Sequence, residues 1–276
     1  MPKKNIVWLA SYPKSGNTWT RIFLANYVFA TDTALPINQV HRLGIGDSVT
    51  KSYEIVAKGP FDAANHQQSL ALRGKVLRAI VANDADINFV KTHCIRDKAL
   101  GVELIPAQLT RSAVYIIRNP LDMVVSYARH YGKTLEEAAR NIGRADNTTA
   151  GGRESVNQYL GNWSRHVRSW TRTRDFPVHA MRYEDMLADP QAAFADLVRH
   201  LGLTLDQDRL DRSIRFSSFD EVSRQESNEP FIERSGNSER FFHTGKAGQW
   251  QDALPPAAID LIRREHHDVM AEFGYL

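Results

Sequence analysis

Residues 5–29 read NIVWLASYPKSGNTWTRIFLANYVF, and their pattern is the most informative about the architecture of the chain. The apolar run at 5–10 predicts a short buried strand. Residues 11–17 are rich in turn formers, and residues 18–29 carry large apolar side chains at roughly helical spacing. Strand, glycine-containing loop and helix in this order bring backbone N–H groups to the positive end of a helix dipole. The order therefore favours an anion site in the loop.

Three residues suit this loop to an anion. Lys14 supplies a positive charge, Gly16 allows close backbone approach, and Thr18 offers a hydroxyl. The loop is not a Walker A motif, because the pattern GxxxxGK[ST] is absent. A tight strand–helix turn with a solvated lysine is the alternative interpretation of this short motif.

A second informative stretch, residues 112–127, reads SAVYIIRNPLDMVVSY. Residues 112–118 predict a buried strand and residues 122–130 a helix, with Arg118 at the end of the strand and Ser126 inside the helix. Open α/β sheets bind ligands at the carboxyl ends of their strands, and a guanidinium matches two phosphate oxygens at once. The alternative is that Arg118 pairs with a nearby carboxylate such as Asp122.

The remaining sequence predicts strands at 87–91 and 178–182 and helices near 67–81, 155–171, 190–201 and 256–273. Residues 31–88 are otherwise irregular, and the polar residues 225–249 predict a long loop. Strands that alternate with helices predict an α/β fold with a central, mostly parallel sheet flanked by helices. A length of 276 residues suits one domain over 1–276.

The composition limits the classes of ligand and partner that we expect, and it also bears on the location of the protein. The formal net charge is only +3 and no block of like charges stands out, so we expect no nucleic-acid partner. The single cysteine, Cys94, allows neither an internal disulfide nor a cysteine-based metal site. No apolar run is long enough for a secretory signal or a membrane span. These features predict a cytoplasmic protein.

The two stretches, taken in this order, resemble the PAPS-dependent sulfotransferase family of the cytosolic type. Three further fragments fall in the family's order: FVKTH at 89–93, RYEDMLADP at 182–190 and FFHTGKAGQW at 241–250. The resemblance thus runs from residue 6 to about 250. It implies a P-loop-like phosphosulfate loop and transfer of a sulfuryl group from 3′-phosphoadenosine 5′-phosphosulfate (PAPS) to a hydroxyl or amine. The acceptor, a small molecule, glycan or lipid, stays unidentified.

The resemblance also implies roles for individual residues. The loop residues Lys14, Ser15, Gly16, Asn17, Thr18 and Trp19 would bind the 5′-phosphosulfate, with Trp19 packed on the adenine. Arg118 and Ser126 would hold the 3′-phosphate, while Tyr183 and the segment Ser217, Ser218 and Phe219 would lie at the adenine. His93 would be the general base of an in-line displacement, since imidazole can accept a hydroxyl proton near neutral pH. Lys91 and Lys14 would offset the charge that develops, and Ser126 would complete the catalytic set; the scheme uses no metal.

The sequence departs from the family at its last motif. The family has Arg-Lys-Gly where this chain has His243, Thr244 and Gly245, so two cationic contacts to the 3′-phosphate are missing. The same region offers Arg240, Lys246 and Arg234 as substitutes, and residues 225–247 are expected to close over the cofactor. The dimerisation segment of animal members is not recognisable after residue 250, which leaves a homo-oligomer open.

Two other functions are compatible with the anion loop. A P-loop-type ATP-dependent kinase would need ATP and Mg²⁺, and the missing Walker A motif argues against it. A non-catalytic nucleotide-binding protein would be favoured if the base were missing, but Lys14, Lys91, His93 and Ser126 are all present.

Overall fold

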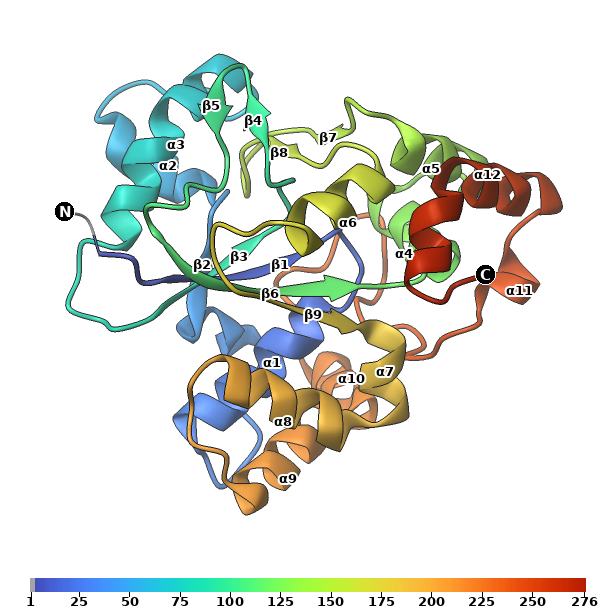
Figure 1. Ribbon diagram of the computed structural model, residues 1–276. Coiled ribbons are helices and arrows are strands. Elements are labelled where there is room, and N and C mark those ends of the chain that lie inside the picture. The colour runs from blue at the N-terminus through green and yellow to red at the C-terminus, as the bar shows by residue number, and fades with distance from the viewer. Residues whose placement is uncertain (1–2) are drawn as a thin grey trace. The chain divides into compact units, whose positions relative to one another are not determined.

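The chain folds around a five-stranded sheet, which a computed structural model describes within residues 3–276. The strand order is β2-β3-β1-β6-β9 (Figure 1). The strands are β1 (Ile6–Ser11), β2 (Gly44–Gly46), β3 (Asn88–Thr92), β6 (Thr110–Ile117) and β9 (Val178–Arg182). β3 pairs in parallel with both β1 and β2. The predicted α/β fold with a central parallel sheet and flanking helices is confirmed.

The internal contacts of the chain form two compact units. The first unit comprises Met1–Tyr12, Gly44–Tyr115 and Asn141–Ala180, and the second comprises Pro13–Leu43, Ile116–Arg140 and Met181–Leu276. Neither unit is continuous in sequence, so each depends on segments that lie far apart in the chain. A single domain over 1–276 stays a prediction.

The first unit contains the sheet strands β1, β2 and β3, most of β6 and an apolar core. Trp8, Tyr115, Trp163 and Trp170 are fully buried in it. A smaller cluster joins Tyr53, Val76 and Val156. The other elements are α2 (Thr50–Ala57), α3 (His66–Ile80), α6 (Trp163–Thr171) and the two-stranded ladders β4 (Lys98–Ala99) with β5 (Val102–Glu103) and β7 (Thr148–Thr149) with β8 (Gln158–Tyr159). Helix α5 (Leu135–Gly143) runs across a boundary between the units.

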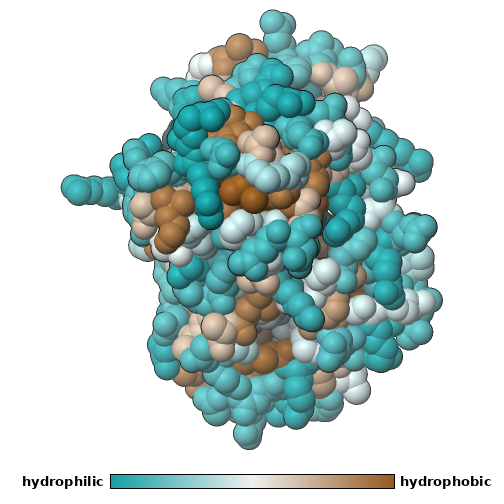
Figure 2. Space-filling view, turned by 90° about the vertical axis from the view of Figure 1, so that its right-hand side faces the viewer, coloured by the Kyte–Doolittle hydropathy of each residue, from teal (hydrophilic) through white to brown (hydrophobic). Residues whose placement is uncertain are grey.

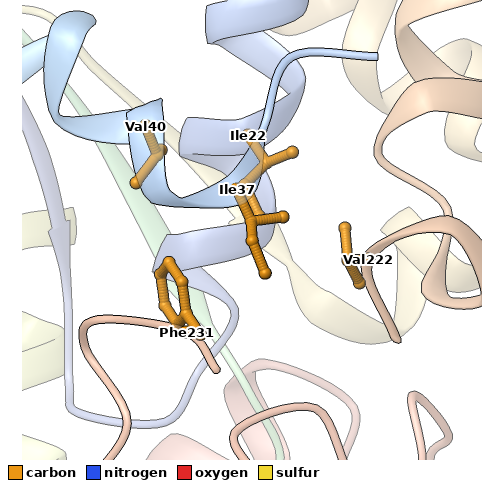
Figure 3. Packing of buried hydrophobic residues seen from close by; sticks show 5 residues of the cluster. All are labelled: Ile22, Ile37, Val40, Val222 and Phe231. Carbon is orange, nitrogen blue, oxygen red and sulfur yellow. The ribbon is translucent and has the colours of Figure 1, made fainter. Parts of the chain in front are cut away.

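The second unit is mainly helical. One of its clusters joins Ile22, Ile37, Val40, Val222 and Phe231, as Figure 3 shows. The elements are α1 (Asn17–Phe29), η1 (Ile37–Arg42), α4 (Pro120–Tyr131), α7 (Tyr183–Ala188), α8 (Pro190–His200), α9 (Gln207–Phe216), α10 (Phe219–Asn228), α11 (Trp250–Ala253) and α12 (Pro256–Glu272). Phe241 and Phe242 pack against the cluster, which anchors the segment after α10 to α1 and η1.

Three sequence predictions need correction. The helix predicted at 155–171 begins only at Trp163, because the Asn162 side chain caps α6 and residues 158–159 pair instead with β7. The loop predicted at 225–249 begins later, since residues 225–228 complete α10. The stretch 31–88 also holds η1, β2 and α2, which are too short to show a clear period.

The face of the molecule in Figure 2 is mainly hydrophilic, with apolar side chains gathered in patches. Large hydrophobic side chains that are more than half exposed include Ile55, Leu100, Ile232 and Leu276. Within residues 3–276, no helix has both the length and the apolar character needed to cross a bilayer.

Candidate functional site

The loop between β1 and α1 has an unusual backbone. Lys14 and Gly16 both have positive φ angles, 69° and 107°. A Cβ atom on residue 16 would lie 2.7 Å from Cδ2 of Tyr183, so only glycine fits between the loop and that ring. The first turn of α1 closes with a hydrogen bond from the backbone N–H of Thr20 to the Gly16 carbonyl, 3.1 Å. The loop therefore presents its backbone at the start of a helix, as an anion site requires.

This loop contains a buried donor without a partner. The Ser15 side chain has no solvent-exposed surface. Its hydroxyl makes no hydrogen bond to any residue in the described part of the chain. Buried polar groups are nearly always paired, so an unpaired hydroxyl in a phosphate-type loop indicates a place for a ligand oxygen.

Arg118 follows β6 and joins two loops. It is 6% exposed, and its terminal nitrogens donate to the Lys14 carbonyl at 3.1 Å and to the Lys246 carbonyl at 3.3 Å. Its guanidinium also lies over the Tyr183 ring, 4.3 Å from the centroid. Nε of Arg118 is buried and has no partner among residues 3–276, so the side chain keeps a donor available for an anion.

Asp122 does not make the alternative ion pair with Arg118. Its carboxylate instead accepts hydrogen bonds from the backbone N–H groups of Gly248 at 2.7 Å and Trp250 at 3.1 Å. Asp122 is 1% exposed, so this is a buried charge held by backbone donors. It fixes the end of the loop that precedes α11.

An aromatic group stands beside the loop. The Trp19 ring meets Tyr183 at 5.7 Å and Phe194 at 5.5 Å between centroids, both edge to face. Its Nε1 is buried without a partner in the described chain. Burial raises the pKa of Tyr183, so its phenol stays protonated at neutral pH. The structure therefore brings Gly16, Trp19, Arg118 and Tyr183 together, and their role in binding the sulfuryl donor stays a prediction.

The last predicted motif lies on the same loop system. Lys14 holds its ammonium 3.8 Å from the centroid of the Phe241 ring. Nε2 of His243 donates to the Ser238 hydroxyl at 2.9 Å, because that hydroxyl already donates to a backbone carbonyl. Partial burial and the positive charges of Arg129 and Lys14 lower the pKa of His243. His243 and Thr244 each keep more than a third of their surface exposed, so the burial of His243 is partial.

The segment at residues 217–219 touches this motif through its aromatic ring. A Cβ atom on residue 245, where φ is 59°, would lie 2.4 Å from Phe219, so Gly245 packs directly on that ring. The Ser217 hydroxyl donates to the Ser213 carbonyl at 2.8 Å, and the Ser218 hydroxyl accepts from the backbone of residue 221. Both serines thus cap helices, α9 and α10. Ser126 is half-buried in α4.

In the first unit, His93 follows directly after β3. Its Nδ1 lies 2.8 Å from the Ser11 carbonyl and 3.3 Å from the Ser11 hydroxyl. A carbonyl can only accept, so Nδ1 carries the hydrogen and donates. In the neutral ring, Nε2 is therefore the unprotonated nitrogen, and its lone pair can accept a proton. A general base at this position needs this tautomer. Lys91, two residues earlier in β3, is half-buried.

Buried side chains hold the backbone around His93. Nε2 of His166 donates to the His93 carbonyl at 3.1 Å, and the Tyr115 hydroxyl lies 2.7 Å from Nδ1 of the same ring. Burial lowers the pKa of His166 to about 4, so this imidazole is neutral at pH 7. His166 did not stand out in the sequence, although its position three residues after Trp163 and four before Trp170 places it on the apolar face of α6.

An ion pair supports the preceding residue. The Thr92 hydroxyl donates to Oδ2 of Asp47 at 2.7 Å, and NH2 of Arg73 contacts the same oxygen at 2.5 Å. Asp47 and Arg73 are 0% and 3% exposed. Neither residue stood out in the sequence, because their partners lie far away along the chain. Cys94 is buried as well, and burial raises the pKa of its thiol to about 11, so it is not a nucleophile at neutral pH.

Side chains of the types that bind metal ions do not cluster in the described part of the chain. Within residues 3–276, no group of three or more His, Cys, Asp or Glu side chains is arranged to hold a metal ion. The polar groups of the loop, Arg118 and the 241–250 segment are donors and cations. This composition fits an anionic ligand.

Comparison with known proteins gives a consistent result. The family model described as "Sulfotransferase domain" matches residues 4–274. Mouse sulfotransferase 2A2 is 28% identical over 166 residues, which are 58% of this chain and 57% of that protein. Rabbit amine sulfotransferase is 23% identical over an alignment that covers 97% of this chain and 81% of that protein. The match thus spans little more than half of the mouse protein.

The fold has a counterpart among solved structures. The crystal structure of retinol dehydratase in complex with androsterone and the inactive cofactor PAP superposes with a TM-score of 0.65 at 20% sequence identity. The superposition covers 97% of this chain and 81% of that chain. This likeness concerns the fold.

Proposed function

Because the chain belongs to the sulfotransferase domain family, we propose that it transfers a sulfuryl group from PAPS to a hydroxyl or amine of an acceptor. Similar proteins support this, since they include an amine sulfotransferase and a protein solved with PAP, the desulfated product of PAPS. A catalytic role for this chain is an inference from family membership together with the geometry of its own residues.

The observation that carries the proposal is the set of donors around the β1–α1 loop. The Ser15 hydroxyl and Nε of Arg118 are buried without partners in the described chain, and Gly16 leaves room that a side chain would fill. A dianionic 5′-group would take the loop donors and Lys14, and Arg118 with Ser126 would take the 3′-phosphate. Trp19 and Tyr183 offer the aromatic surface that an adenine requires.

His93 is the proposed general base. Because Nδ1 donates to the Ser11 carbonyl, Nε2 of the neutral ring can accept the proton of an acceptor hydroxyl. As the acceptor oxygen forms its bond to sulfur, the bond from sulfur to the bridging phosphate oxygen breaks and its electron pair stays with PAP. A positioned base of this kind contributes about 10²- to 10⁴-fold in rate.

The cations are proposed to stabilise the charge that develops on the leaving oxygen. Lys14 lies in the loop that would hold the 5′-phosphosulfate, and Lys91 lies in the strand that leads to His93. Preorganised charges of this type lower a barrier by about 3–4 kcal/mol for each donor. Serine at position 126 would add a hydroxyl donor from α4.

Ligand-dependent thermal stability tests the donor site first. A ligand that binds only the folded state at 100 times its Kd stabilises by about 2.7 kcal/mol. We expect such a shift with PAP and a much smaller one with AMP or ADP, because those lack the 3′-phosphate. A shift only with ATP–Mg²⁺ would instead support the kinase alternative.

Turnover tests catalysis separately. Radiolabelled PAPS with 2-naphthol, a hydroxysteroid and an arylalkylamine as acceptors should yield a labelled product with at least one of them. His93→Gln should keep the PAP-dependent thermal shift and lose transfer by about 10²- to 10⁴-fold. If the wild type binds PAP but transfers to no acceptor of a wider panel, a non-catalytic nucleotide-binding protein becomes the better description. A cytoplasmic location, the oligomeric state and the closing of residues 225–247 over the cofactor stay predictions.

A further inference from the structure

The two arginines that the sequence offered as substitutes for the missing cations of the 243–245 motif each donate to a neighbouring group of the protein. NH1 of Arg234 donates to the Glu239 carbonyl at 2.7 Å, and NH2 of Arg240 donates to the Ser227 hydroxyl. The Arg234 guanidinium thus bonds within its own loop, and that of Arg240 ties the loop to the end of α10. The third candidate, Lys246, is exposed.

The last turn of α4 offers another cation. Arg129 follows Ser126 by three residues within the helix α4, so both side chains lie on one face of that helix. Arg129 is half-buried. If Ser126 contacts the 3′-phosphate, a guanidinium one turn further along the same face can reach the same group.

The 237–243 segment packs against this turn. The Asn237 side chain donates to the His130 carbonyl at 3.4 Å, and the rings of His130 and Phe241 meet edge to face at 6.5 Å. Phe241 in turn carries the ammonium of Lys14 on its ring. The segment that lacks the family's cations therefore rests on the turn that contains Arg129, next to Lys14.

The charges agree with this packing. The positive charges of Arg129 and Lys14 both lower the pKa of His243, so the guanidinium and the ammonium act on the same imidazole. The negative charge of Glu226 acts in the opposite direction and raises the pKa of His243. Both Glu226 oxygens accept backbone N–H groups, those of Phe241 at 2.6 Å and Phe242 at 2.9 Å. A surplus of cations around a partly buried position is an arrangement that favours an anion.

We propose that Arg129 binds the 3′-phosphate of the sulfuryl donor and takes the place of the Arg-Lys pair that His243 and Thr244 have replaced. This inference rests on the proposed function and names a donor-binding residue outside the family's motifs. A guanidinium is suited to the role because it offers two parallel donors to two phosphate oxygens. The cation thus comes from the helix instead of the loop.

The test compares two ligands that differ only in the 3′-phosphate. Kd values for PAP and for AMP are measured by calorimetry on the wild type and on Arg129→Gln. A hydrogen bond to a charged group is worth about 1.5–3 kcal/mol, so PAP affinity should fall by about 10- to 150-fold while AMP affinity stays the same. Equal losses for both ligands, or no loss for PAP, would overturn the assignment.

Two further variants separate binding from a merely structural role. Arg199→Gln is the matched control, because it removes the same charge from the last turn of another helix, α8. It should leave PAP affinity unchanged. His243→Arg with Thr244→Lys, added to Arg129→Gln, restores the family motif and should recover most of the lost PAP affinity. A wild type that binds no PAP would refute the proposed function itself, whereas PAP binding that is insensitive to Arg129→Gln would refute only this inference.

Discussion

Lowering the pH from 7 to 5 should destabilise the protein through the buried imidazole of His166. Its pKa is 6.5 in the unfolded chain and about 4 in the folded protein, because burial disfavours the charged ring. Between these two values the unfolded state binds more protons than the folded state. The stability is therefore fully present above pH 6.5 and is lost as the pH falls toward 4.

The magnitude follows from the two pKa values. At pH 7 the proton linkage costs almost nothing, and at pH 5 it costs about 2 kcal/mol of unfolding free energy for His166 alone. His266 has a folded pKa of about 4 for the same reason, so it adds a similar cost. Together the two histidines predict a loss of roughly 4 kcal/mol, a large share of the stability of an ordinary domain.

Urea unfolding at pH 7 and pH 5 measures this difference for the wild type, His166→Gln and His266→Gln. Each variant should be less stable at pH 7, since it loses packing or a hydrogen bond. The loss of unfolding free energy between pH 7 and pH 5 should nevertheless be about 2 kcal/mol smaller in each variant than in the wild type. If His166→Gln loses as much stability on acidification as the wild type, the imidazole is not the group that titrates and the reasoning is wrong.

Three other substitutions have defined outcomes. Gly16→Ala places a methyl 2.7 Å from the Tyr183 ring at a φ of 107°, so we expect a loss of about 1–3 kcal/mol in urea unfolding and weaker PAP binding in calorimetry. Arg73→Met leaves the carboxylate of Asp47 buried and unpaired, which should cost about 3–5 kcal/mol, and adding Asp47→Asn should recover part of that loss. Asp122→Ala frees two backbone donors of the following loop, so limited proteolysis at residues 229–249 should be faster; unchanged cleavage would show that other contacts hold the loop.

The sequence predicted those parts of the structure that depend on local pattern. The β1–loop–α1 stretch has a strand, turn formers and a helix within 25 residues, and each element appears where the pattern placed it. Arg118 directly follows β6, because the strand ends one residue earlier than the pattern predicted. The family resemblance then connected stretches that no local pattern could join.

Hydrogen-bond partners that lie far apart in the chain could not be predicted from local sequence pattern. Arg118 donates to carbonyls 104 and 128 residues away in the chain, and Asp122 binds backbone groups 126 and 128 residues away. A carboxylate four residues after an arginine invites an ion pair in sequence reasoning, but tertiary packing gave each residue other partners. The same limit hid the contact between α4 and the 237–243 segment, on which the role of Arg129 depends.

The helix that was predicted too long illustrates a different limit. Apolar spacing continues through Val156, Tyr159 and Leu160, so the pattern extends the helix back to residue 155. The structure starts α6 at Trp163, because Asn162 caps it and Gly161 adopts a φ of 63°. The Asn162 cap and the pairing of β8 with β7 outweighed the periodicity, because tertiary context overrides a local helical pattern.

The discontinuous make-up of the two units has a consequence for biosynthesis. The first unit is complete in sequence at Ala180, so it can close its core while the ribosome is still adding the remaining residues. The second unit cannot, because its early apolar side chains Ile22, Ile37 and Val40 pack on Val222 and Phe231. We therefore expect these early apolar side chains to lack their late packing partners until residues 222–231 have been synthesised.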